Sequence, residues 1–311
     1  MEKRQIGTSG IAVAPLALGG NVFGWTADEA TSFAILDAFV DAGGTMFDTA
    51  DVYTAWVPGH VGGESEGVIG RWLKRDPSKR DKVVIATKAG FLEGLAPDKI
   101  AAACDASLQR LGIDLIDLYY QHKDDESVPL ADSLGAYERL LEAGKIRSIG
   151  LSQFTAARLE EALETGNRLG LTKPAALQPW YNLVERAKFE DELRDVALRH
   201  DLAVFPFYSL ANGFLTGKYR SKDDLGKSVR GLRNVEYLEG RGMRVLEALD
   251  EVAAETGAAL ATVALAWTKV QPAIVAPIAS ATSMEQLAEL LAALELELTP
   301  QQIQRLDQAS A

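Results

Sequence analysis

Strand-like and helix-like segments alternate from one end of the chain to the other, and this alternation predicts an α/β fold, a closed (β/α)₈ TIM barrel. Eight short apolar runs are separated by stretches whose apolar residues recur at helical spacing. The main competitor is an open doubly wound sheet, which usually carries Gly-x-Gly-x-x-Gly after its first strand, and that spacing is missing here. No repeat or Pro-rich linker interrupts the 311 residues, so we expect a single domain over 1–311.

Each element can be placed from its local pattern. Two short segments at 3–6 and 12–14 predict an N-terminal β-hairpin that closes the bottom of the barrel. The predicted strands lie at 15–19, 45–48, 83–87, 115–121, 146–151, 175–178, 202–206 and 273–277. The predicted helices lie at 28–42, 65–75, 98–111, 131–143, 155–168, 187–199, 242–256 and 284–294. A last capped helix is expected at 299–308, with Thr299 as N-cap and Pro300 at its first position.

Composition excludes several classes of function. The net charge is −12 and there is no basic tract, which argues against nucleic acid and anionic membranes as partners. The longest apolar runs are too short for a membrane span, and the N-terminus lacks the apolar core of a signal peptide. The single cysteine cannot form an internal disulfide. We therefore expect a soluble cytoplasmic protein, while the sequence leaves its oligomeric state open.

Four residues that can donate or accept a proton, or shift the pKa of a neighbouring group, lie at or just after the ends of three successive predicted strands. Asp48 ends the first of these strands and Tyr53 follows it, whereas Lys88 and His122 come at the ends of the next two. The carboxyl ends of parallel strands face one side of the sheet, where active sites are built. Each residue alone has an ordinary structural role, but together they favour a site.

These four side chains suit carbonyl chemistry. A tyrosine has a pKa of about 10, and we expect the ammonium of Lys88 to lower the pKa of Tyr53. A carboxylate at Asp48 would keep Lys88 charged and in place. An imidazole at His122 would hydrogen-bond a substrate carbonyl oxygen.

The chain resembles the aldo-keto reductases, especially the branch related to bacterial oxidoreductases and potassium-channel β subunits. The matching motifs follow in family order and cover nearly the whole chain. They are Phe47-Asp48-Thr49-Ala50-Asp51-Val52-Tyr53, Gly63-Glu64-Ser65-Glu66, Ala86-Thr87-Lys88, Asp117-Leu118-Tyr119-Tyr120-Gln121-His122, Gly150-Leu151-Ser152-Gln153-Phe154, Leu177-Gln178-Pro179-Trp180-Tyr181-Asn182-Leu183 and Leu215-Thr216-Gly217-Lys218-Tyr219.

The resemblance implies a TIM barrel that binds NADP(H), with NAD(H) possible, and reversibly reduces a small aldehyde or ketone. Tyr53 would be the general acid, Lys88 would lower its pKa, Asp48 would pair with Lys88, and His122 would orient the carbonyl. Ser152 and Gln178 would bind the nicotinamide carboxamide, and Tyr208 would stack on the ring. The loop 209–218 would cover the pyrophosphate, with Lys218 and Arg230 supplying charge. The full set expected to contact the cofactor is Gly20, Asn21, Ser152, Gln153, Gln178, Tyr208, Ser209, Leu210, Gly213, Leu215, Gly217, Lys218, Arg230, Ser280, Thr282 and Gln286.

The sequence departs from the family pattern at three places. Gln153 replaces the usual asparagine, and Leu210 replaces a proline. The segment at 280–282 lacks the arginine that commonly holds the 2′-phosphate of NADP, for which a guanidinium is well suited. The resemblance still favours NADP(H), because most of the family uses it and because Ser280, Thr282 and Gln286 could hydrogen-bond the 2′-phosphate. NAD(H) is the second candidate.

Two other functions remain open. The chain could act mainly as a cofactor-sensing binding protein with little turnover, as channel-β-like relatives can. The run 63–67 also matches the Gly-x-Ser-x-Gly of serine hydrolases, with Ser65 as nucleophile, but it does not directly follow a core strand. The three histidines are far apart, so no metal site is expected. Trp25 and Phe91, in predicted loops beside the site, are candidates for binding substrate, along with Phe23, Trp56 and Trp180.

Overall fold

The computed structural model describes residues 2–311 and is a (β/α)₈ barrel, as the sequence predicts. Eight parallel strands follow one another around the sheet in the order β10-β3-β4-β5-β6-β7-β8-β9. They are β3 (Ala17–Gly19), β4 (Met46–Asp48), β5 (Val84–Ala89), β6 (Leu118–Gln121), β7 (Ile149–Ser152), β8 (Ala176–Gln178), β9 (Ala203–Val204) and β10 (Ile278–Ala279). A parallel bridge between Val204 and Ile274 joins β9 to the segment before β10, and this bridge closes the circle.

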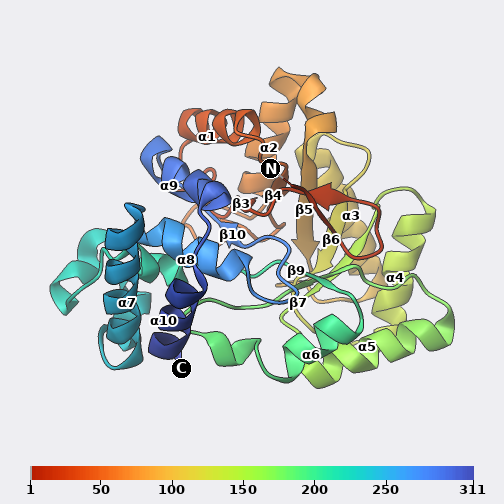
Figure 1. Ribbon diagram of the computed structural model, residues 1–311. Coiled ribbons are helices and arrows are strands. Elements are labelled where there is room, and N and C mark those ends of the chain that lie inside the picture. Colours follow the sequence, from red (N-terminus) through yellow and green to blue (C-terminus); the bar gives the residue numbers. More distant parts are fainter. Residues whose placement is uncertain (1) are drawn as a thin grey trace.

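Helices surround the strands, as Figure 1 shows. Their bounds are α1 (Glu29–Asp41), α2 (Glu64–Arg75), α3 (Pro97–Leu111), α4 (Leu130–Glu142), α5 (Ala156–Leu169), α6 (Glu192–Arg199), α7 (Arg241–Thr256), α8 (Leu260–Lys269), α9 (Met284–Glu295) and α10 (Pro300–Ser310). Side chains cap the N-termini of four helices. Asp28, Thr155, Ser283 and Thr299 each accept a hydrogen bond from a backbone N–H of the first turn. The predicted cap at Thr299 is confirmed and is a full capping box with Gln302. No helix of this described part is long and apolar enough to cross a membrane.

The predicted N-terminal hairpin is present as β1 (Arg4–Gln5) and β2 (Ala12–Val13). Its apolar residues Ile6, Ile11 and Val13 are buried in one cluster with residues of the barrel interior. The guanidinium of Arg4 donates to the carbonyl oxygens of Lys269, Ile274 and Val275. The hairpin therefore covers the amino-terminal end of the barrel and leaves the carboxyl-terminal end for the site.

Side chains alternate between two layers along each strand, as the pleat requires. Met46 and Ala86 belong to the interior cluster, whereas Phe47 and Ile85 belong to the cluster between strands and helices. The same alternation decides which polar residues at the strand ends face the barrel axis.

Three sequence-based placements are wrong. The last strand lies at Ile278–Ala279, not 273–277, because the chain around Ile274 only bridges β9 before it reaches β3. Helix α8 is missing from the prediction, because most of its residues are buried and no polar face marks a helical period. The helix expected at 187–199 is split into the 3₁₀ segment η2 (Arg186–Lys188) and α6.

A close approach between α2 and α3 depends on Gly70. A β-carbon at this position would lie 2.2 Å from the carbonyl oxygen of Arg110, which is fixed backbone. We expect Gly70→Ala to destabilise the protein by about 1–3 kcal/mol, because helices must move apart to admit the methyl group. Gly166→Ala in α5 is the matched control, since a β-carbon there meets nothing within 4 Å. Thermal unfolding should show a lower free energy of unfolding for Gly70→Ala and a gain of up to about 1 kcal/mol for Gly166→Ala. Equal stabilities of the two variants would contradict the packing described.

Candidate active site at the carboxyl-terminal mouth

The four proton-handling residues predicted from the sequence come together at the carboxyl-terminal mouth of the barrel. Asp48 and Lys88 share the strand face of Met46 and Ala86, so both side chains enter the barrel interior. His122 directly follows β6, and Tyr53 lies in the loop after β4. Asp48, Lys88 and His122 are all buried.

The ammonium of Lys88 is the centre of the group. It donates to Asp48 Oδ2 at 2.7 Å, to the carbonyl oxygen of Thr49 at 2.7 Å and to the hydroxyl oxygen of Tyr53 at 3.0 Å. Its side chain is fully buried, and the Asp48 carboxylate is 1 % exposed. A buried ammonium with three oxygen acceptors is held in one orientation, so the phenol of Tyr53 always has this cation as its neighbour.

The expected lowering of the Tyr53 pKa is wrong. Burial raises the pKa of Tyr53 well above its usual range, and the Asp48 carboxylate, which accepts a hydrogen bond from the phenol at 3.3 Å, raises it further. The physical reason is that Asp48 already offsets the charge of Lys88, so little of it is left to stabilise a phenolate. Burial also lowers the pKa of Lys88, against the opposing effect of Asp48. The phenol therefore keeps its proton at neutral pH.

His122 is a neutral imidazole at neutral pH. Burial lowers its pKa well below the usual range, and the nearby cations Lys88 and Lys123 lower it further. Its Nδ1 is buried without a hydrogen-bond partner among residues 2–311. The ring lies edge-on to Tyr53, with centroids 6.1 Å apart. A neutral imidazole can donate one hydrogen bond, so His122 and the Tyr53 phenol can both act on the same oxygen atom.

The ends of β7 and β8 extend this network. Gln178 Nε2 donates to Asp48 Oδ1 at 2.8 Å, and Ser152 Oγ donates to the carbonyl oxygen of Gln178 at 2.9 Å. Gln153 has a left-handed backbone, with φ of 56°, and its amide nitrogen donates to the carbonyl oxygen of His122 at 3.0 Å. With these donors committed, Ser152 Oγ and Gln178 Oε1 still have lone pairs for an amide N–H group, which fits the carboxamide of a nicotinamide.

Tyr208 is held beside this network in an uncommon backbone conformation. Its φ is 55°, and the Asn182 side-chain amide donates to its carbonyl oxygen at 2.9 Å. Its ring packs edge-on against Trp180, with centroids 5.2 Å apart. A left-handed non-glycine residue fixed in this way is a feature of functional sites, and it fits a ring presented for stacking.

The segment after β9 is built from three 3₁₀ segments, η3 (Ala211–Thr216), η4 (Lys222–Lys227) and η5 (Gly231–Leu238). Gly213 and Gly217 both have positive φ, which the tight loop requires. Ser209 and Leu215 are buried, and Leu210 is partly buried. Lys218 packs over the ring of Tyr219, whereas Arg230 stacks over Trp25, with its guanidinium carbon 5.3 Å from the ring centroid. The two cations expected to bind phosphate thus have different surroundings.

A polar group joins β3 to β10. Ser280 Oγ donates to Asn21 Oδ1 at 2.8 Å, next to Gly20. The backbone N–H and hydroxyl of Thr282 both donate to Gln286 Oε1, at 2.9 and 3.1 Å. These residues lie together, as the sequence predicts for a cofactor subsite, but they offer hydroxyl and amide groups rather than a cation.

Aromatic side chains line the approach to Tyr53 and His122. Trp25 packs edge-on against Trp56, which packs against Tyr53, with centroid distances of 5.6 and 6.2 Å. Phe91 lies against the ring of His122 at 4.9 Å. Phe91 therefore lies directly beside His122, and Trp25 is linked to Tyr53 through the Trp56 ring. Phe23, in contrast, is fully buried in the core and does not line this approach.

A second pair of acids, missed by the sequence reasoning, lies near the site. Glu66 is fully buried and accepts hydrogen bonds from Thr87 and Arg110, each at 2.6 Å. Asp51 has a buried Oδ1 with no partner within residues 2–311. Burial, and then the charge of Glu66, raises the pKa of Asp51 to about 7. The sequence did offer one sign of Asp51 as a candidate, because it is a second acid only three residues after Asp48 in Asp48-Thr49-Ala50-Asp51.

Ser65 does not have the surroundings of a nucleophile. It is fully buried in the first turn of α2, donates to the carbonyl oxygen of Gly20 at 2.7 Å and accepts from Thr49 Oγ1 at 2.8 Å. Its hydroxyl joins two loops, and no histidine is bonded to it. The Gly-x-Ser-x-Gly match is thus explained by packing.

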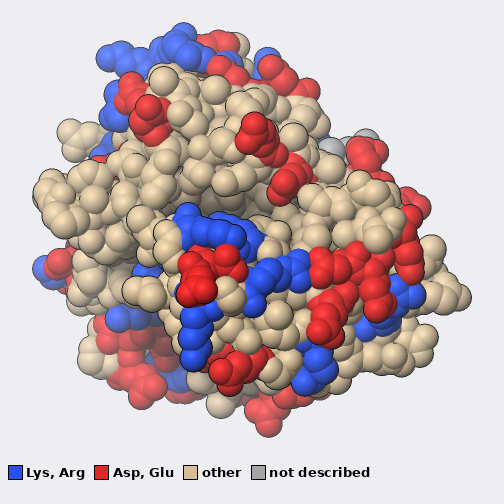
Figure 2. Space-filling model, turned by 90° about the vertical axis from the view of Figure 1, so that its left-hand side faces the viewer, with Lys and Arg blue, Asp and Glu red and all other residues tan. Residues whose placement is uncertain are grey.

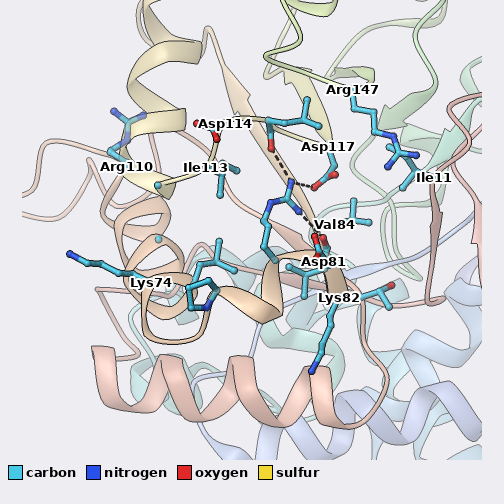
Figure 3. Close-up of a pocket in the computed structure, with 18 of the residues that line it drawn as sticks. Ile11, Lys74, Asp81, Lys82, Val84, Arg110, Ile113, Asp114, Asp117 and Arg147 are labelled. Carbon is cyan, nitrogen blue, oxygen red and sulfur yellow. Dashed lines mark hydrogen bonds and ion pairs between the residues drawn. The ribbon is translucent and has the colours of Figure 1, made fainter.

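A groove of about 1270 Å³ lies at the opposite, amino-terminal end, between the hairpin, α2 and α3. The Arg80 guanidinium occupies it, donating to Asp117 Oδ2 at 2.8 Å and to the carbonyl oxygens of Leu115 and Val83. Lys74 and Lys82 on its border point away from one another, as Figure 3 shows. The groove is large, but its cations do not converge and none of the proton-handling residues reaches it.

Four proton-handling groups gathered at the carboxyl-terminal mouth of a (β/α)₈ barrel are suited to general acid–base catalysis on a small molecule. A model of the aldo/keto reductase family matches residues 15–311, and the chain belongs to that family. It is thus an NAD(P)-dependent oxidoreductase, as the resemblance in its motifs implied.

Curated relatives match nearly the full length of the chain. An uncharacterized oxidoreductase, YrpG, of Bacillus subtilis is 33 % identical over 309 residues, covering 96 % of this chain and 92 % of that protein. A probable voltage-gated potassium channel subunit beta of rice is 31 % identical over 321 residues, covering 99 % and 96 %. The L-glyceraldehyde 3-phosphate reductase of Escherichia coli K12 is 30 % identical over 326 residues, covering 99 % and 92 %.

Proposed function

We propose that the protein reduces an aldehyde or ketone to the alcohol with NADP(H), and that Tyr53 donates the proton. The observation that supports this most strongly is the buried Lys88 ammonium, shared between the Asp48 carboxylate and the Tyr53 hydroxyl. A reduction needs a proton for the carbonyl oxygen, and a phenol that stays protonated at neutral pH beside a fixed cation can supply it.

Each residue has a defined part in this proposal. When bound, the nicotinamide cofactor supplies the hydride for the carbonyl carbon. Neutral His122 donates a hydrogen bond to the carbonyl oxygen and orients it. Tyr53 transfers its proton to that oxygen, and the Lys88 ammonium, which donates a hydrogen bond to the Tyr53 hydroxyl oxygen, holds this group in position. Asp48 holds Lys88 in position.

The cofactor would be held by residues from the second half of the barrel. Ser152 and Gln178 would accept hydrogen bonds from the carboxamide, and Tyr208 would stack on the ring and leave its other face to the substrate. Lys218 and Arg230 would bind the pyrophosphate. Ser280, Thr282 and Gln286 would bind the 2′-phosphate with hydroxyl and amide groups. Because these groups are uncharged, NAD(H) is the second candidate.

Parallel titrations with NADPH and NADH, followed by a screen of aldehydes and ketones with the better cofactor, test the proposal. We expect tighter binding of NADPH and steady oxidation of it in the presence of aldehydes. Tight cofactor binding without turnover of any carbonyl compound would instead support a cofactor-sensing binding protein.

A further inference from the structure

A charged cluster lies behind the proposed site, on the face of β5 that is turned toward the helices. Thr87 precedes Lys88, and because side chains alternate along a strand, Thr87 points toward the helices while Lys88 points into the barrel. Thr87 Oγ1 donates to Glu66 Oε1 at 2.6 Å, and Glu66 Oε2 accepts from Arg110 Nε, also at 2.6 Å. Glu66, in the first turn of α2, is fully buried. A buried carboxylate is therefore fixed to the residue next to Lys88, on the other side of the strand.

Asp51 adds a second carboxylate to this cluster. Its backbone N–H donates to the carbonyl oxygen of Lys88 at 3.1 Å, so the residue lies beside the same strand end. Its Oδ1 is buried without a hydrogen-bond partner among residues 2–311. Burial, and then the charge of Glu66, raises the pKa of Asp51 to about 7, and Arg110 opposes this rise. At alkaline pH the outer cluster (Asp51, Glu66 and Arg110) therefore carries an excess of one negative charge.

This negative charge acts on Lys88. The side chain of Lys88 is fully buried, and burial lowers its pKa, which favours the neutral amine. Asp48 opposes that effect from inside the barrel, and Asp51 and Glu66 oppose it from the outer side. Charges of both signs are interspersed on the face shown in Figure 2, where solvent screens them, whereas Glu66 is enclosed by protein. Its charge therefore reaches Lys88 without a direct contact.

Other titratable groups that face Lys88 and the outer cluster stay uncharged at neutral pH. Burial lowers the pKa of one of them, His122, and raises the pKa of the others, which are Tyr53, Tyr119, Tyr137 and Cys104. The charge of Lys88 thus depends on Asp48 from inside the barrel and on the outer cluster from behind β5.

We propose that Asp51 and Glu66 are positioning residues for the reaction, because their negative charge keeps Lys88 protonated from behind β5. A protonated Lys88 holds the Tyr53 hydroxyl oxygen by the hydrogen bond at 3.0 Å, and a charged donor makes a stronger hydrogen bond than a neutral amine. Arg110 fixes the orientation of Glu66 and offsets part of its charge. This inference rests on the proposed function, because it takes Tyr53 as the proton donor.

Isosteric substitutions test the inference. Glu66→Gln and Asp51→Asn each remove one negative charge and keep the shape of the side chain. In each variant, the alkaline pH at which kcat for an aldehyde falls to half its maximum should decrease by about half to one pH unit, the effect of one nearby charge inside a protein. Asp81→Asn, at an exposed carboxylate bordering the groove at the amino-terminal end, is the control and should not shift this pH.

A second measurement follows Lys88 without turnover. In protein that contains ¹⁵N-labelled lysine, the Nζ resonance of Lys88 reports the pH at which the ammonium loses its proton. The resonance is assigned by its loss in Lys88→Met. We expect the midpoint of this titration to move to lower pH in both Glu66→Gln and Asp51→Asn, in step with the alkaline limb of kcat.

The outcomes separate the possible errors. An unchanged Lys88 midpoint in both variants would overturn the inference. A lower kcat at every pH with an unchanged midpoint would also overturn it, because the carboxylates would then act only through packing. Unfolding does not explain a shift in Asp51→Asn, since the loss of a buried alkaline carboxylate is expected to stabilise that variant. If the wild type reduces no aldehyde or ketone while the Lys88 midpoint shifts as expected, the proposed function itself fails.

Discussion

Tyr53→Phe is expected to lower the rate of carbonyl reduction by about 10²–10⁴-fold, the usual contribution of a positioned proton donor. The ring keeps its packing against Trp56, and Lys88 retains Asp48 and the Thr49 carbonyl oxygen as acceptors. The variant should therefore fold and bind the cofactor as the wild type does. The loss should appear in kcat, because only the proton donated to the carbonyl oxygen is removed.

Single-turnover rates with saturating NADPH, together with the Kd for NADPH, measure this effect. Tyr137→Phe is the matched control, since it removes another buried hydroxyl, which is bonded to the carbonyl oxygen of Tyr120 and lies away from the mouth. Retained turnover in Tyr53→Phe would falsify the assignment of the proton donor.

Asp51→Asn is expected to stabilise the protein at alkaline pH. An aspartate titrates at about 3.9 in the unfolded chain, whereas burial, and then Glu66, raises the pKa of Asp51 to about 7 in the folded state. The folded protein therefore holds this proton more tightly, so stability is lost as pH rises from about 4 to about 7. A tenfold change in proton affinity is worth about 1.4 kcal/mol, and the full loss is about 4 kcal/mol.

Urea unfolding of wild type and Asp51→Asn across this pH range measures the effect. We expect the variant to gain about 4 kcal/mol relative to the wild type between pH 4 and 8, because asparagine does not titrate. Asp81→Asn, at an exposed carboxylate without an ion pair in the described chain, should show no comparable trend. A constant difference between wild type and Asp51→Asn would show that Asp51 does not titrate in this way.

Sequence patterns predicted the barrel well because each strand–helix unit carries its own periodicity. They failed where burial removes that signal. Helix α8 is buried on nearly all sides, so no polar face marks its turns. The strand β10 has only two residues, and the apolar run before it extends beyond the paired part. The 3₁₀ segments after β9 have no longer-range period at all.

The clustering of the four proton-handling residues was predictable from the sequence, but the pKa shifts within the cluster were not. Asp48, Lys88 and His122 mark strand ends, and strand ends of a parallel barrel meet at one mouth. The direction of the Tyr53 pKa was not predictable, because it depends on how completely Asp48 offsets the charge of Lys88 and on how deeply the phenol is buried. The contact between Gln178 and Asp48 joins residues 130 positions apart, which no local pattern shows.

That long-range contact has a consequence for protein synthesis. Residues 48–122 leave the ribosome well before Gln178, so the Asp48 carboxylate has only part of its native set of partners during much of translation. Orientation of Asp48 from both of its oxygens becomes possible only once β8 has been made and docked. A nascent chain that stalls before this point would carry an incompletely oriented Asp48 carboxylate. The site would reach its native arrangement only late in synthesis, when the last strands complete the barrel.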